Sequence, residues 1–148
     1  MPSAPPVLPE RTWWIERDPL LGGAYPGDLD PRVARRKLEA LLELGIRCFV
    51  NLMEEHERDH AGAPFEPYSP LVATLAHARE LHIELARFPI PDQGVPSVAH
   101  MRALQTFLDG RRALGHPTYV HCWGGRGRTG TVAGITLIRR GLATPHDF

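Results

Sequence analysis

The chain has 148 residues, about the length of one domain, which is enough to bury a hydrophobic core without a disulfide or a metal. Hydrophobic residues make up 43% of the sequence and charged residues 23%, and 17 basic side chains balance 17 acidic ones. This balance excludes a strong overall field of the kind that attracts nucleic acid or an acidic membrane surface, so we expect no nucleic-acid partner and only a local basic site.

Residues 1–11 are predicted to form a flexible lead-in, because they are rich in proline and lack the apolar run of a signal peptide. The most apolar stretch of the chain, LEALLELGIRCFVNLM, is interrupted by charged residues and falls short of the roughly 20 apolar residues of a membrane span. The two cysteines, Cys48 and Cys122, are too few for a disulfide framework. We therefore expect a cytoplasmic protein with reduced thiols and no stable membrane insertion.

The first half of the chain is predicted to form two strands, one helix and a third strand. Residues 12–16 and 20–25 are predicted to be a hairpin-like pair of strands that ends in a Pro-Gly-Asp turn. The apolar residues that follow are spaced for one face of a helix, with Asp30 as its N-cap and Gly45 after its end. Residues 46–52 are almost continuously apolar, as in a strand that is covered on both faces.

The polar segment 53–69 is predicted to be a long exposed loop, and loops of that length usually carry function. The remaining elements alternate again: a helix, a strand, a proline-rich loop, a helix capped by Ser97, a strand and a last helix. Their predicted bounds are 70–81, 82–88, 89–97, 97–114, 118–122 and 129–140. This alternation predicts an α/β fold, in which a central, mostly parallel sheet of about four or five strands is flanked by helices.

The last residues of the chain have the pattern of a helix start. Thr144 is a candidate N-cap, Pro145 occupies the first helical position, and Asp147 is an acidic residue in the first turn. The sequence then stops at Phe148. We therefore expect residues 12–148 to form one domain from which a C-terminal helix has been cut off.

The stretch YVHCWGGRGRTGT lies between the predicted strand 118–122 and the last helix, where α/β folds place their ligand sites. Residues 125–130 fit the G-x-G-x-x-G pattern of a dinucleotide turn, but only 18 residues follow, too few for the strand and acidic residue that such a site needs. A Walker-type loop needs a lysine where this chain has Arg128. His121 and Cys122 lack the further nearby ligands of a zinc site. We therefore expect no cofactor and no metal.

Cys122 is the candidate nucleophile in this stretch. A free cysteine is usually a buried, inert thiol, and this interpretation suits Cys48 in its apolar strand. It suits Cys122 poorly, because Cys122 leaves its strand where the backbone turns through glycines and then begins a helix. Thiolates are stabilised at helix N-termini and beside cations, and Cys122 has both features.

The residues after Cys122 are predicted to form a cradle for an anion. A glycine-rich turn can curl so that its backbone N–H groups point to one place, and the helix adds its positive end there. The glycines at 124, 125 and 127 are expected to take the positive φ angles that this curl needs. Arg128 carries a planar fork that suits two phosphate oxygens. The predicted phosphate-binding residues are Trp123, Gly124, Gly125, Arg126, Gly127 and Arg128.

The string HCWGGRGRT matches H-C-x5-R-[S/T] and resembles the signature of the cysteine-dependent protein tyrosine phosphatase superfamily. The length and the glycine-rich form of the turn are similar to the dual-specificity-like branch, particularly its small bacterial and kinase-associated phosphatase-like members. The resemblance runs from about residue 20 to 141 and implies a single phosphatase domain. It implies that Cys122 is the nucleophile, Arg128 the phosphate clamp, Thr129 a hydroxyl donor to the thiolate and His121 a buried support of the loop.

Departure of an alkoxide or phenoxide requires a general acid on another loop. Asp92, in PIPDQGVPS directly after a predicted strand, resembles the acid of this family. The alternative is that Asp92 is only a turn residue, which Pro-Asp-x-Gly would also explain. Gln93 is a candidate for orienting the hydrolytic water. The expected reaction passes through a phosphocysteine and needs no metal or cofactor.

The sequence favours a protein tyrosine or dual-specificity phosphatase that acts on a phosphorylated protein. An alternative is a phosphoinositide or inositol phosphate phosphatase, since Arg126 lies inside the loop, although Trp123 stands where those enzymes tend to carry a basic residue. Arg126 could instead pair with Glu54 or Glu55. An alternative of another class is a non-catalytic phosphoprotein-binding module, which need not keep both a nucleophile and an acid. The sequence does not predict an oligomeric state.

Overall fold

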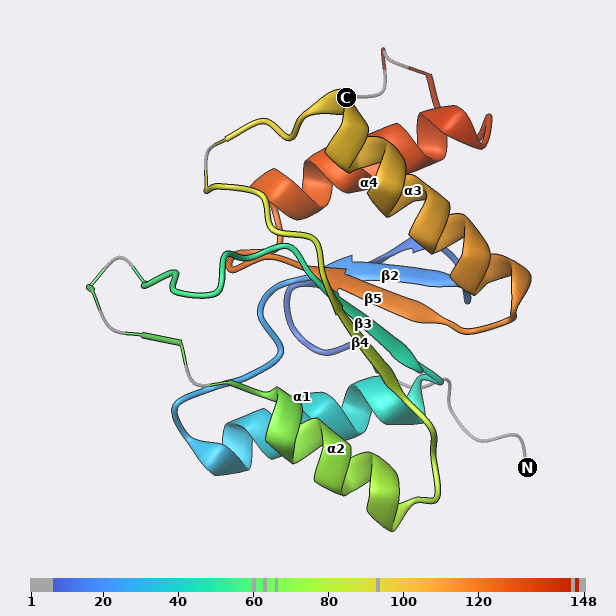
Figure 1. Ribbon diagram of the computed structural model, residues 1–148. Coiled ribbons are helices and arrows are strands. Elements are labelled where there is room, and N and C mark those ends of the chain that lie inside the picture. The colour runs from blue at the N-terminus through green and yellow to red at the C-terminus, as the bar shows by residue number, and fades with distance from the viewer. Residues whose placement is uncertain are drawn as a thin grey trace.

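The computed structural model describes residues 7–59, 61–62, 64–65, 67–92, 94–144 and 146. In it, a five-stranded sheet lies between two pairs of helices, α1 with α2 on one face and α3 with α4 on the other (Figure 1). The strands are β1 (Thr12–Glu16), β2 (Leu20–Gly23), β3 (Cys48–Asn51), β4 (Glu84–Arg87) and β5 (Thr118–His121). The helices are α1 (Pro31–Glu43), α2 (Ser69–Ala78), α3 (Val98–Ala113) and α4 (Gly127–Arg139).

The strand order β1-β2-β5-β3-β4 gives a mostly parallel sheet, as the sequence predicted. β1 and β2 form the antiparallel pair, while β2, β5, β3 and β4 run parallel to one another. The register aligns Gly23, His121, Asn51 and Arg87 across the parallel strands. The carboxyl ends of these strands therefore lie at one edge of the sheet, and the loops that leave them meet there.

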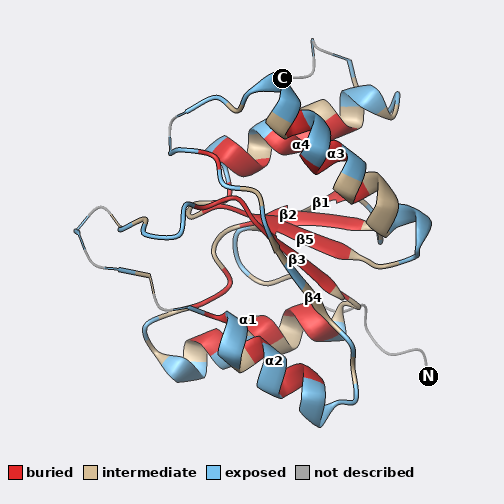
Figure 2. Cartoon of the chain, viewed as in Figure 1, coloured by how far each residue is buried: buried red, intermediate tan, exposed pale blue. Residues whose placement is uncertain are grey.

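The sheet separates two hydrophobic cores (Figure 2). Val50 and Val120 face α3 and α4, whereas Phe49 and Tyr119, one position along each strand, face α1 and α2. This is the alternation that a pleated strand imposes on its side chains. All residues of β3 and β5 are buried, which confirms that the apolar strand predicted over 46–52 is covered on both faces.

The last helix begins earlier than the sequence predicted. α4 starts at Gly127 instead of residue 129, and the carbonyl of Arg126 accepts a hydrogen bond from Gly130 N at 2.8 Å. The pattern of buried apolar side chains could not locate this start, because the first turn of α4 faces the carboxyl edge of the sheet and not the core. The earlier start places Arg128 and Thr129 in the first turn of the helix.

Among the residues that the structure describes, none of the helices combines the length and the apolar character needed to cross a lipid bilayer. The same residues contain no cluster of three or more His, Cys, Asp or Glu side chains arranged to hold a metal ion.

Candidate active site

Cys122 follows β5 directly, at the edge of the sheet where the parallel strands end. The turn from Cys122 to α4 reverses direction at Gly125, whose φ is +79°. A Cβ atom at this position would lie 2.6 Å from Ala24 N and 2.7 Å from the carbonyl carbon of Gly23, so the turn rests on the backbone after β2. Only glycine meets both requirements.

The prediction that three glycines of this turn take positive φ angles was wrong for two of them. Gly125 does, but Gly124 and Gly127 do not. Gly127 is the first residue of α4 and has right-handed helical geometry. A Cβ atom on Gly124 would meet no atom within 4 Å, so neither backbone angle nor space demands glycine there. One left-handed residue is enough to turn the chain, because the helix begins two residues later.

The thiol of Cys122 is buried beside the N-terminus of α4. Thr129 Oγ1 lies 3.0 Å from Cys122 Sγ and 3.3 Å from the carbonyl oxygen of Gly23. The Thr129 hydroxyl has one proton, which it can donate to either acceptor. Donation to Sγ and the positive end of α4 both direct positive charge towards the sulfur atom.

Arg128 is held by a carboxylate that comes from the polar loop. Glu57 accepts two hydrogen bonds from its guanidinium, from Nη1 at 2.7 Å and from Nη2 at 2.8 Å, and the carbonyl oxygen of Ile90 accepts a third at 3.0 Å. Only 4% of the Arg128 side chain is exposed. Burial lowers the pKa of Arg128, but its hydrogen bonds and charge interaction with Glu57 raise the pKa above its usual value overall. Arg128 is therefore a fixed cation.

Glu57 binds the end of the guanidinium formed by Nη1 and Nη2. The side edge, formed by Nε and the second hydrogen of Nη2, makes no hydrogen bond to any residue that the structure describes. In the same part of the chain, the amide groups of residues 124–129 donate none either. Glu57 thus orients Arg128 through the Nη1/Nη2 end of its guanidinium. The Nε/Nη2 edge and the amides of residues 124–129 remain able to donate hydrogen bonds to a ligand.

Asp92 and Arg126 are the other two charged residues that the sequence predicted for this site. Asp92, on the loop after β4, is 52% exposed, and its Oδ1 is 3.7 Å from Arg128 Nη2. Arg126 is exposed, and no ion pair in the described residues joins it to Glu54 or Glu55, the partners considered from the sequence. The glutamate that reaches the site is Glu57, and it binds Arg128 instead. Gln93 lies outside the described residues.

His121 is fully buried at the end of β5, next to Cys122. Its Nδ1 is 3.3 Å from the carbonyl oxygen of Cys122, and its Nε2 is 2.7 Å from the hydroxyl of Tyr68. Because a carbonyl only accepts, we assign the proton to Nδ1, which leaves Nε2 to accept from Tyr68. Burial lowers the pKa of His121 to about 3, so the imidazole is neutral.

Sequence reasoning missed two residues that contact the site, Glu57 and Tyr68. Both belong to the segment 53–69, which was expected to carry function without any single residue being chosen. Glu57 is one of four glutamates there, and spacing alone does not show which one reaches the turn. Tyr68 is buried, and its hydroxyl donates a hydrogen bond to His121, which lies 53 residues away in sequence.

The second cysteine, Cys48, is buried within β3 and unpaired. Burial raises the pKa of its thiol to about 12. The parallel register places Cys48 beside Thr118, four residues before Cys122. At roughly 3.3 Å per residue, the two cysteines are about 13 Å apart along the strands, beyond the ~7 Å reach of a disulfide.

We expect the buried His121 to make the protein less stable as the pH falls from 6.5 towards 3. Its pKa is about 3 in the folded protein and ~6.5 in an unfolded chain, so between these values only the unfolded state binds the proton. The free energy of unfolding should therefore be lower at pH 5 than at pH 7 by about 2 kcal/mol on account of this residue. Urea denaturation at the two pH values measures the difference.

The variant His121→Gln should lose most of this pH dependence, whatever its stability at pH 7. His77→Gln, a change at an exposed position of α2, is the matched control and should keep the wild-type dependence. An equal fall in stability for wild type and His121→Gln would contradict a neutral His121 in the folded protein.

Residues 14–147 match a family model described as the DSP-PTPase phosphatase domain of Swiss Army Knife proteins (PTP-SAK). Among curated proteins, phosphatidylglycerophosphate phosphatase PTPMT2 of Arabidopsis thaliana is 30% identical over 130 residues, which cover 85% of this chain and 47% of that protein. An uncharacterised Methanocaldococcus jannaschii protein, MJECL20, is 37% identical over 60 residues, or 41% of its length. The chain thus spans less than half the length of these curated relatives.

Two solved structures are similar in fold. Tk-PTP in its active form superposes with a TM-score of 0.65 at 24% identity, covering 90% of this chain and 77% of that one. PTPMT1 in complex with PI(5)P superposes with a TM-score of 0.64 at 23% identity, covering 93% of this chain and 78% of that one. At these identities the likeness concerns the fold alone.

Proposed function

We propose, from the premise that this chain belongs to the DSP-PTPase phosphatase domain family, that it is a metal-independent phosphomonoester hydrolase acting through a phosphocysteine. A phosphorylated protein, dephosphorylated at tyrosine or at both tyrosine and serine or threonine, is the proposed substrate. The two thiols are unpaired, which agrees with a cytoplasmic enzyme.

The observation that carries the proposal is the way Arg128 is held. Glu57 engages one end of the guanidinium, and the edge formed by Nε and Nη2 stays available for two phosphate oxygens. The amides of residues 124–129 supply further donors for an anion next to the helix N-terminus. These donors and the fixed charge of Arg128 suit the negative charge of a transferring phosphoryl group.

In the first step, Cys122 Sγ attacks phosphorus as the thiolate. The S–P bond forms while the P–O bond to the leaving group breaks, and the protonated Asp92 gives its proton to the departing oxygen. Asp92 suits this role, because its exposed carboxyl group lies on a different loop from Cys122 and is 3.7 Å from Arg128.

In the second step, water attacks the phosphocysteine. Asp92, now a carboxylate, takes a proton from the water, the new P–O bond forms and the S–P bond breaks. The electron pair returns to Cys122 Sγ, where the Thr129 hydroxyl, 3.0 Å away, stabilises the thiolate as it leaves. Release of inorganic phosphate restores the starting state.

The test is hydrolysis of an aryl phosphate in the presence of EDTA, with acid-quenched samples examined by mass spectrometry. The expected results are turnover that EDTA does not change and a phosphoryl group on the peptide that contains Cys122. Turnover that EDTA abolishes would contradict the proposal. Tight phosphopeptide binding without any turnover would favour the non-catalytic binding module.

A second candidate is a lipid or inositol phosphate substrate. It is favoured by the 30% identity with a phosphatidylglycerophosphate phosphatase and by the exposed Arg126 within the turn. The two candidates separate when kcat/KM is compared for a phosphotyrosine peptide, a phosphothreonine peptide, an inositol phosphate and phosphatidylglycerophosphate vesicles. Preference for either of the last two, lost in Arg126→Ala, would overturn the protein phosphatase assignment.

We expect Glu57→Gln to lower kcat/KM for an aryl phosphate by about 10- to 100-fold. The change leaves the buried Arg128 without its paired charge, and a hydrogen bond to a charged group contributes about 1.5–3 kcal/mol. Initial-rate kinetics measure the change.

Glu55→Gln is the control for Glu57→Gln, because Glu55 is an exposed residue of the same loop. It should keep the wild-type rate. Equal rates for wild type and Glu57→Gln would mean that Glu57 does not position Arg128 for the reaction.

A further inference from the structure

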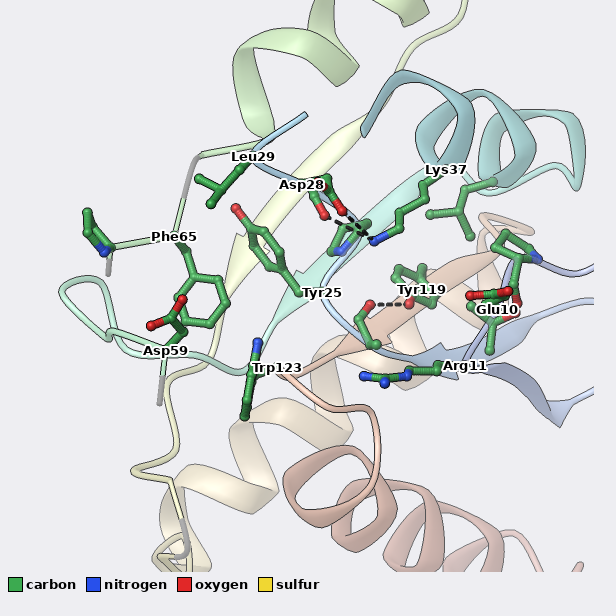
Figure 3. A pocket seen from close by; sticks show the side chains of 17 residues that line it. Glu10, Arg11, Tyr25, Asp28, Leu29, Lys37, Asp59, Phe65, Tyr119 and Trp123 are labelled. Carbon is green, nitrogen blue, oxygen red and sulfur yellow. Dashed lines mark hydrogen bonds and ion pairs between the residues drawn. The ribbon is translucent and has the colours of Figure 1, made fainter. Parts of the chain in front are cut away.

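A cavity of about 350 Å³ lies beside the proposed phosphate-binding turn, with Trp123 of that turn in its wall (Figure 3). It is lined by the residues before β1, by the connection from β2 to α1 and by Asp59, Pro64 and Phe65 of the loop 53–69. Its volume is at the lower end of the range for pockets that bind small molecules or side chains. None of the steps proposed above uses it.

Trp123 makes this cavity continuous with the turn. Its backbone carbonyl accepts a hydrogen bond from Tyr25 N at 3.0 Å, and its ring lies 6.1 Å from that of Phe65, which is 5.0 Å from the ring of Tyr25. All three rings line the cavity. Trp123 also follows Cys122 in sequence, so the wall of the cavity begins one residue after the nucleophile.

The remaining lining contains an exposed apolar side chain and charged side chains of both signs. Leu29, which is 71% exposed, lies at the side opposite Trp123. The cation Lys37 is engaged by Asp28 at 3.6 Å and by the carbonyl oxygen of Gly27 at 3.3 Å. A carboxylate therefore already compensates the charge of Lys37.

The two cations of the lining, Arg11 and Lys37, are outnumbered by the carboxylates of Glu10, Asp28 and Asp59. A second phosphate would find no surplus of positive charge there, and an anionic membrane surface would gain no electrostatic attraction from this lining. Aromatic rings and a leucine side chain instead stabilise an apolar group, while the carboxylates can accept hydrogen bonds from the amides of a peptide backbone.

We propose that this cavity binds the apolar side chain of a residue next to the phosphorylated residue of a phosphopeptide. The inference rests on the proposed phosphatase function. It narrows the substrate class to phosphopeptides that carry an apolar residue next to the phosphorylated residue. The rings of Trp123, Phe65 and Tyr25 and the side chain of Leu29 line the space in which the apolar side chain packs, and Trp123 connects the occupied cavity to the loop that holds the phosphoryl group.

The test is a double-mutant cycle that compares two enzymes, wild type and Leu29→Ser, on two peptides. One phosphotyrosine peptide carries leucine on both sides of the phosphorylated residue, and the other carries alanine. For the wild type we expect KM to be about fivefold lower for the leucine peptide, which corresponds to partial burial of one leucine side chain. In Leu29→Ser the two KM values should differ by less than about twofold.

Leu114→Ser is the matched control, because Leu114 is also exposed but lies after α3, at the opposite end of the strands. It should keep the wild-type preference. All three proteins should hydrolyse p-nitrophenyl phosphate equally, since this small substrate does not reach Leu29. A leucine preference that Leu29→Ser leaves intact, or no preference in the wild type, would overturn the inference.

The same cycle separates failure of the inference from failure of the proposed function. If p-nitrophenyl phosphate is not hydrolysed, the function fails, and the cycle is repeated with equilibrium dissociation constants from fluorescence anisotropy of the two labelled peptides. The inference then holds only if Leu29→Ser removes the preference in binding. A rise in KM for phosphatidylglycerophosphate vesicles in Leu29→Ser, with unchanged peptide KM, would assign the cavity to a lipid and overturn it.

Discussion

Replacing Cys122 with serine should lower kcat for an aryl phosphate by about four orders of magnitude or more. A serine hydroxyl is far less acidic than a thiol, so the helix N-terminus and the Thr129 hydroxyl beside this position cannot give the variant a comparable nucleophile. The side chain is nearly the same size, and the amides and Arg128 are unchanged. Phosphopeptide binding should therefore survive the loss of turnover, and isothermal titration with the variant measures it.

Cys48→Ala is the matched change at the other cysteine. Its thiol lies in β3, about 13 Å from Cys122 by the strand register, so the variant should keep the wild-type rate although it loses some stability. Residual activity in Cys122→Ser close to that of the wild type would rule out the phosphocysteine mechanism. Loss of both turnover and binding would instead mean that the turn no longer folds.

Asp92→Asn should lower kcat by about 10²- to 10³-fold for substrates with a poor leaving group. An amide has no proton of suitable acidity to give to the departing oxygen, but it keeps the size of the side chain and its hydrogen-bonding capacity. The loss should shrink for p-nitrophenyl phosphate, because p-nitrophenoxide departs with less need of a proton. Comparing phenyl phosphate with p-nitrophenyl phosphate in wild type and variant measures this dependence.

Leaving-group dependence distinguishes a general acid from a residue that only supports the site. Glu57→Gln disturbs Arg128, so it should slow both aryl phosphates by the same factor. An Asp92→Asn variant that slows both substrates equally would therefore assign Asp92 to positioning or charge balance near Arg128. A variant that is as fast as wild type would leave Asp92 as a turn residue.

Much of the fold follows from local patterns in the sequence. The apolar run over 46–52 predicted a buried strand, and β3 is that strand, because a strand covered on both faces needs apolar residues at successive positions. Asp30 was predicted to cap a helix, and it accepts a hydrogen bond from Arg32 N at 2.9 Å at the start of α1. Both features depend on neighbours in sequence, which a single chain reveals.

The site was less predictable where it depends on contacts between distant segments. Cys122 and Arg128 are six residues apart, so spacing was enough to single them out. Glu57 is 71 residues from Arg128, and Tyr68 is 53 residues from His121. These pairs exist because the sheet brings the loop 53–69 over the end of β5, and no periodicity in the sequence encodes that placement.

The hydrogen bonds of Arg128 connect three segments, since Glu57 and Ile90 accept from the same guanidinium and Asp92 stands 3.7 Å away. Phosphate binding at the proposed site and the positions of two separate loops therefore share one thermodynamic cycle. In such a cycle the coupling is reciprocal: any molecule that draws Glu57 away changes the affinity for phosphate by the factor by which phosphate changes the affinity for that molecule. Through the single side chain of Arg128, a partner that binds Glu57 would thus change phosphate binding at the proposed site beside Cys122.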